Sequence, residues 1–129
     1  MIRAITLLLG IAACEQDESI SAFVDVGSVW QLTSIGGVAF SAKATLVFPK
    51  PGQVTGQAPC NNYSAAQTAP YPWFELGPII ATKRACPDLA AEGLMMKTLQ
   101  SMTISEVSGD VLVLSDDTGF EMLFQRSRP

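Results

Sequence analysis

The sequence contains no histidine, only three cysteines among its 129 residues, and few basic residues, with 8 Lys+Arg against 12 Asp+Glu. Without histidine, neither a Ser-His-Asp nor a Cys-His nucleophile system can form, and the usual histidine-containing zinc sites are excluded. A formal net charge of −4 argues against a basic surface that holds nucleic acid. An enzyme would have to be built from Ser, Thr, Lys, Tyr and carboxylates, and no pair has a spacing that recommends it. We therefore expect no enzyme activity and no catalytic residue, metal, cofactor or nucleic-acid partner.

The sequence also lacks a hydrophobic run long enough to be a permanent membrane span. Arg3 is followed by an apolar run over residues 4–13, and charge returns at Glu15. As a helix this run would span about 15 Å, roughly half of a bilayer core. A short charged region followed by such a run is typical of an export signal.

The end of the run, Ile11-Ala12-Ala13-Cys14, resembles the bacterial lipobox, in which the cysteine receives a diacylglycerol. We expect residues 1–13 to be a lipoprotein signal peptide, Cys14 to be the lipid attachment site, and residues 14–26 to form an acidic tether. An ordinary secretory signal is the alternative, but Ile11 is large for the first small position of a cleavage site ending at Ala13. With Glu15 after the cysteine, we expect an exported protein anchored through its lipid on the periplasmic face of the outer membrane.

The two remaining cysteines, Cys60 and Cys86, are expected to form a disulfide, because an exported chain enters an oxidising compartment. Redox or metal chemistry is the alternative. Against it, the sequence has no C-x-x-C spacing and no third free thiol once Cys14 carries lipid.

After the tether, alternating apolar and polar residues between turn signals predict short strands. The predicted segments are 29–33, 38–40, 44–48, 53–56, 73–76, 79–82, 103–107, 111–115 and 120–125, with 61–68 compatible with a strand. Residues 87–102 instead have helical spacing, because Ala91, Met95, Leu99 and Met102 fall on one face. The pattern predicts a mostly β, α+β domain over residues 27–126. Its architecture would be a small antiparallel β-barrel or strongly curved sheet of about seven or eight strands, capped by one helix.

The order of these landmarks resembles the META domain family, whose members include HslJ-like proteins. The resemblance is carried by Trp30-x-Leu32, Leu46-x-Phe48, Val54-Thr55-Gly56, Cys60-Asn61-x-Tyr63, Ile80-Ala81-Thr82, Ala85-Cys86, Glu92, Leu99, Gly109-Asp110-x-Leu112-x-Leu114 and Met122-Leu123-Phe124. One departure is Pro59, where the family commonly has glycine before the first motif cysteine. The resemblance implies a compact α+β barrel in bacterial envelope proteins, often lipoproteins, with links to heat shock and antibiotic tolerance and no established catalytic activity.

Two short clusters are candidate contacts for a ligand or partner. Asn61, Asn62 and Tyr63 could present amides and a phenol, although asparagine in a tight turn commonly caps its own backbone. Lys83 and Arg84 form an adjacent basic pair that could receive a carboxylate or phosphate, although a solvated loop is the simpler interpretation.

Two further clusters have a structural interpretation that we favour. Residues 116–119, Asp-Asp-Thr-Gly, have oxygen ligands in a row but lack the later glutamate of a calcium loop, so a β-turn is expected. Met95, Met96 and Met102 could line an adaptable groove, but core packing is expected.

These observations favour a non-catalytic envelope lipoprotein that contributes to stress or antibiotic tolerance through contact with another envelope protein. The alternative is a small-ligand or lipid-binding barrel, either a carrier or a pilotin-like protein. The pilotin link rests on fold-level analogy alone. A third possibility is a protease inhibitor. A carrier should show a pocket of several hundred Å³, and a contact module a filled interior with exposed apolar side chains.

Overall fold

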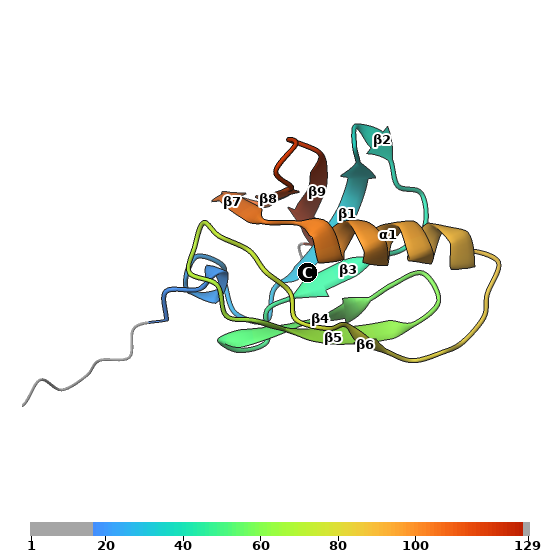
Figure 1. The fold of residues 1–129 in the computed structure, drawn as a ribbon, viewed down its shortest axis with the longest axis horizontal. Helices are drawn as coiled ribbons and strands as arrows, with labels where there is room; N and C mark the ends of the chain where they lie inside the picture. Colours follow the sequence, from blue (N-terminus) through green and yellow to red (C-terminus); the bar gives the residue numbers. More distant parts are fainter. Residues whose placement is uncertain (1–16, 128–129) are drawn as a thin grey trace, which may run out of the picture.

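A computed structural model describes residues 17–127, which fold into one antiparallel sheet and one long helix (Figure 1). The strands in this part of the chain are β1 (Val29–Ile35), β2 (Val38–Ala39), β3 (Thr45–Val47), β4 (Gly52–Gln57), β5 (Asn62–Gln67), β6 (Ile80–Ala81), β7 (Ile104–Ser108), β8 (Val111–Ser115) and β9 (Glu121–Arg126). The helices are the 3-10 helix η1 (Ile20–Ala22) and α1 (Leu89–Ser101). The expected signal peptide and Cys14 lie outside the described residues.

The strands follow the order β6-β5-β4-β3-β1-β9-β8-β7, and β2 pairs with β1 beside this path. Because β6 and β7 end the path, the sheet is strongly curved but not closed into a barrel. This confirms the curved-sheet form of the expected fold. The register between β1 and β9 shifts between Leu32 and Ser34, so β1 carries an irregularity there. At this point the two arms of the sheet meet, one made of β3 to β6 and the other of β7 to β9.

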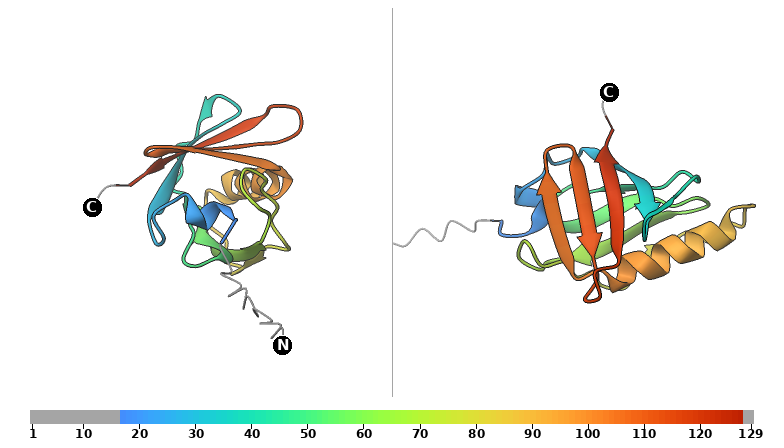
Figure 2. Two further views of the ribbon diagram at one scale, coloured as in Figure 1. Left: turned by 90° about the vertical axis from the view of Figure 1, so that its left-hand side faces the viewer. Right: turned by 90° about the horizontal axis from the view of Figure 1, so that it is seen from above.

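The core fills the space between the curved sheet and α1. Figure 2 shows α1 lying between the β7–β9 arm and the arm that contains β3 to β5. The largest fully buried side chains come from both arms and the helix: Trp30, Phe48, Phe74, Phe124, Ile20, Leu32, Leu46, Met95, Leu99, Met102, Leu112 and Leu114. Alternation along β8 explains which of its side chains enter the core, since Leu112 and Leu114 are buried while Val111 is exposed.

The helix follows its predicted apolar face. Met95, Leu99 and Met102 are fully buried, and Met96 packs partly against the core, so these methionines serve packing. The helix begins at Leu89 rather than at residue 87, and its N-cap residue Asp88 makes no side-chain capping bond. No helix in residues 17–127 is long and apolar enough to cross a membrane.

Residues 73–76, expected to be a strand, form only two isolated bridges. Trp73 pairs with Ile104, and Leu76 pairs with Gln67. The Gln67 side-chain oxygen accepts the backbone N–H of Ala69 at 3.2 Å and that of Glu75 at 2.9 Å, which fixes this segment as an ordered loop.

The N-terminal segment differs from the tether expected over residues 14–26. Within its described part, η1 carries Ile20 into the core, where the side chain is 1% exposed. The carbonyl of Glu18 accepts the backbone N–H of Tyr71 at 2.7 Å, and Ser19 bridges to Pro70. A buried isoleucine and these backbone bonds make the segment from Glu18 onward part of the folded unit.

Candidate functional site

The expected disulfide joins Cys60 and Cys86, with their Cα atoms 5.6 Å apart. It links the turn before β5 to the loop that leads into α1, across a sequence separation of 26 residues. Both cysteines are therefore structural in this fold.

A buried hydrogen-bond network surrounds the disulfide and accounts for Asn61. The side-chain amide of Asn61 donates to Glu92 Oε2 at 2.7 Å and to the carbonyl of Arg84 at 3.0 Å. Its oxygen accepts the Thr82 hydroxyl at 2.9 Å and the backbone N–H of Arg84 at 2.5 Å. Asn61 is 6% exposed and uses its side chain entirely within the fold, so it positions the loop after β6.

Tyr63 is also held inside the fold. Its hydroxyl donates to the carbonyl of Thr45 at 2.7 Å, and burial raises the pKa of the phenol far above its ordinary value of 10.0. The neutral phenol is therefore a fixed donor that joins β5 to β3. Gly56 permits this contact, because a Cβ there would lie 2.6 Å from Tyr63 Oη and overlap the Thr45 carbonyl.

A groove with a volume of about 920 Å³ lies on the outer face of β1, β3, β4, β5 and β6. We call it the outer groove. It is lined by Val29, Gln31, Lys43, Thr45, Val47, Thr55, Gly56, Gln57, Asn62, Tyr63, Ser64, Ile80, Ala81, Thr82 and Ser127. These lining residues include no aspartate or glutamate, although the chain is acidic overall, and Lys43 is their one charged residue.

Two smaller hollows adjoin the outer groove. One of about 200 Å³ shares Lys43, Gln57 and Asn62 with it and extends to the Cys60 turn. Another of about 500 Å³ shares Ser64 and Ile80. Ile80 is 74% exposed and stands between two hollows on the edge strand β6. The outer face thus offers a continuous surface with amide, hydroxyl and apolar contacts.

The predicted contact residues divide between these environments. Asn62 is exposed and lines the outer groove. Tyr63 borders the groove but is only 3% exposed, with its hydroxyl held by Thr45, and Asn61 belongs to the buried network. Lys83 and Arg84 are exposed but are not among the groove's lining residues. Their contact with a ligand or partner stays a prediction.

Lys43 and the outward residues of β1, β3 and β4 were not predicted from the sequence as contact residues. Alternation marks them as the solvent side of strands, but it does not show that five strands form a hollow there.

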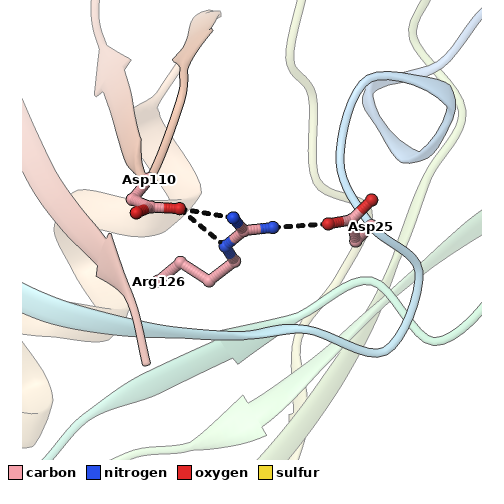
Figure 3. Close-up of polar contacts among 3 residues, drawn as sticks. All are labelled: Asp25, Asp110 and Arg126. Atoms are coloured by element: carbon pink, nitrogen blue, oxygen red, sulfur yellow. Dashed lines mark hydrogen bonds and ion pairs between the residues drawn. The ribbon is translucent and has the colours of Figure 1, made fainter. Parts of the chain in front are cut away.

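An ionic cluster joins the β7–β9 arm of the sheet to the N-terminal segment (Figure 3). Arg126 of β9 binds Asp110, in the turn between β7 and β8, and Asp25, which precedes β1. The Arg126 Nε donates to Asp110 Oδ1 at 2.9 Å. Hydrogen bonding to Asp110, with its negative charge, raises the pKa of the guanidinium.

The segment over residues 116–119 is a turn, as expected. The Asp116 carboxylate accepts the backbone N–H of Thr118 at 2.8 Å and that of Phe120 at 3.0 Å. Within residues 17–127, no group of three or more His, Cys, Asp or Glu residues is placed to hold a metal ion.

Comparison with known families matches the META domain over residues 23–129, so the chain belongs to the META domain family. Among solved structures, it is similar to a Burkholderia xenovorans protein determined by NMR. That pair is 20% identical, with a TM-score of 0.64, and the match covers 81% of this chain and 84% of the other. It is also similar to a DUF4847 family protein from Bacteroides vulgatus, at 10% identity and a TM-score of 0.67, covering 84% of this chain and 98% of the other. At these identities the similarities establish the fold alone. No match was found among curated proteins.

Proposed function

We propose that this META domain protein is a non-catalytic lipoprotein of the cell envelope that acts by contact with another envelope protein. The observation that carries the proposal is the outer groove. It is large, open and free of acidic lining residues on a chain with a net charge of −4. The side chains of the sheet and helix pack together in the interior, which supports a recognition surface on the outside of the domain.

The anchor in this proposal is a lipid on Cys14, on the evidence of the lipobox-like segment that precedes it. More than one acyl chain on a cysteine holds a protein firmly on a membrane, because each buried CH₂ contributes about 0.8 kcal/mol. We place the domain on the periplasmic face of the outer membrane. The role in stress or antibiotic tolerance follows from the resemblance to HslJ-like proteins.

The chemistry of the outer groove suits an extended peptide segment. The groove runs up to β6 at the end of the strand path, where Ile80 and Ala81 pair with β5 on one side. An edge strand accepts backbone hydrogen bonds from a partner, and neighbouring side chains select the sequence. Lys43 would favour a partner segment that carries a carboxylate.

A second candidate function is binding of a small apolar molecule in the same groove. Its volume of about 920 Å³ favours this, since ligand pockets commonly measure roughly 300–1,000 Å³. This candidate differs from a barrel carrier, because the ligand would lie on the outer face.

Site-specific photocrosslinking in a Gram-negative host tests the proposal. A photoreactive residue at Thr55 in the outer groove should capture one reproducible envelope protein, identified by mass spectrometry. The matched control is Val38, which is 71% exposed on β2 and does not line the groove. Equal capture from both positions, or none from Thr55, would contradict the protein-contact proposal. A small molecule that copurifies with the chain and is lost in a Thr55→Trp variant would favour the second candidate.

A further inference from the structure

The link between the expected lipid site and the folded unit is short. The chain is attached to the domain at Glu18, whose carbonyl accepts the backbone N–H of Tyr71 at 2.7 Å. Four peptide steps separate Cys14 from Glu18 in the sequence. With about 3.8 Å between consecutive Cα atoms, Glu18 can lie no more than about 15 Å from an acylated Cys14. An acylated chain would therefore hold this end of the domain within about 15 Å of the lipid headgroups.

Exposed aromatic side chains lie at the same end. Phe23 is 53% exposed, and its ring stacks on Tyr71 with centroids 4.2 Å apart. Tyr71 is half-buried, and its hydroxyl accepts the backbone N–H of Val107 at 3.1 Å, so it supports the exposed Phe23 ring. Trp73 is 58% exposed, and its backbone N–H donates to the carbonyl of Pro70 at 2.8 Å. We call Phe23, Tyr71 and Trp73 the N-terminal aromatic patch. Figure 1 and the left view of Figure 2 show η1 and the loop before β6 together beside the start of the described chain.

We propose that the N-terminal aromatic patch rests on the lipid headgroup surface and orients the domain. This inference depends on the proposed acylation of Cys14. Tryptophan favours the membrane interface, because its ring is largely apolar and carries one polar N–H group, and the exposed Phe23 ring adds apolar surface. The patch itself supplies no positive charge, and its neighbours in the sequence, Asp17, Glu18 and Asp25, are acidic. The contact therefore depends on aromatic insertion rather than on attraction to anionic lipid.

The orientation has a consequence for the rest of the domain. Helix α1 begins at Leu89, at the end of the molecule far from η1 (Figure 1). That end would point away from the membrane. Leu89 is 50% exposed, which makes it a matched position for comparison with Trp73.

Tryptophan fluorescence of the mature, acylated protein tests the inference. The chain has two tryptophans, and Trp30 is 1% exposed, so Trp73 reports on the surface while Trp30 gives a constant background. The protein is purified from a Gram-negative host, its N-terminal mass is measured, and it is reconstituted into phosphatidylethanolamine/phosphatidylglycerol vesicles with or without brominated phospholipid. The control is the double variant Trp73→Phe, Leu89→Trp, with circular dichroism to confirm that both proteins are folded.

We expect the wild-type emission to shift to shorter wavelength on reconstitution and to lose intensity with brominated lipid, while the control variant shows neither change. Equal quenching of both proteins, or no quenching of the acylated wild type, would overturn the aromatic contact and leave the lipoprotein proposal intact. An N-terminal mass without acyl chains would overturn both. The mass measurement thus separates the two failures.

Discussion

Glu92 on the first turn of α1 binds the loop that contains Asn61 with both of its carboxylate oxygens. Oε1 accepts the backbone N–H groups of Cys60 at 3.0 Å and Asn61 at 2.8 Å, and Oε2 accepts the Asn61 side-chain amide at 2.7 Å. Glu92 is 7% exposed. One acidic side chain thus compensates a set of buried N–H donors that the sheet leaves unpaired, and it connects the helix to the disulfide-bonded turn.

Replacement of Glu92 by glutamine should destabilise the fold by about 1–3 kcal/mol, because the amide presents a donor to groups that are themselves donors. Urea unfolding followed by fluorescence measures the effect. Asp88→Asn is the matched control, since it removes the same charge beside the same helix end, where Asp88 makes no side-chain capping bond. An equal loss in both variants would show that the helix dipole, rather than the contact with Asn61, is responsible.

Removal of the disulfide by the double substitution Cys60→Ser, Cys86→Ser should cost about 3.5 kcal/mol for a separation of 26 residues, on the chain-entropy relation. The unfolding midpoint in urea should fall accordingly. A reducing agent should lower the midpoint of the wild type and leave that of the double variant unchanged. Incorporation of two alkyl labels into the wild type without reductant would contradict the bond itself.

Gly56→Ala should destabilise the fold by about 1–3 kcal/mol, because the new methyl group would displace the Tyr63 hydroxyl from the Thr45 carbonyl. Gly77→Ala is the control, since its Cβ would make an ordinary contact of 3.6 Å with Ala66. Thermal unfolding of the two variants measures the difference. Similar midpoints would show that the sheet moves easily at Gly56.

Gly93→Ala should stabilise the protein by about 1 kcal/mol. Gly93 lies within α1, and a Cβ there would meet nothing within 4 Å, so the substitution gains helix propensity without a clash. The reciprocal substitution Ala90→Gly, at an exposed position of the same helix, should lower the stability by a similar amount. A destabilised Gly93→Ala variant would indicate that this face of the helix is covered in solution.

The turn at Asp116 should contribute to the acid sensitivity of the protein. The hydrogen bond from the Thr118 side chain, with backbone N–H bonds, lowers the pKa of Asp116 below its ordinary value of 3.8. The stabilisation is therefore complete above pH 3.8 and is lost as the pH falls through the lower folded-state pKa. An NMR titration of the carboxyl group should show the lowered pKa, and Thr118→Val should move it back toward 3.8. An unchanged titration in Thr118→Val would assign the shift to the backbone donors alone.

Local patterns in the sequence predicted most of the secondary structure, because each strand or helix shows which of its faces is buried. Leu112 and Leu114 alternate as a strand requires, and Met95, Leu99 and Met102 recur at helical spacing. The prediction of a strand over residues 73–76 was wrong. Trp73 and Leu76 form only two isolated bridges, and Phe74 packs in the core.

The sequence by itself determined most of the strands, the helix, the cysteine pair and the resemblance to the META domain family. Only the tertiary structure decided that the sheet stays open, that Ile20 enters the core, that Glu92 meets Asn61, and that residues of β1 and of β3 to β6 line one groove. The physical reason is that periodicity records burial along a single element. Curvature, edge closure and contacts between distant residues depend on how all the elements pack together.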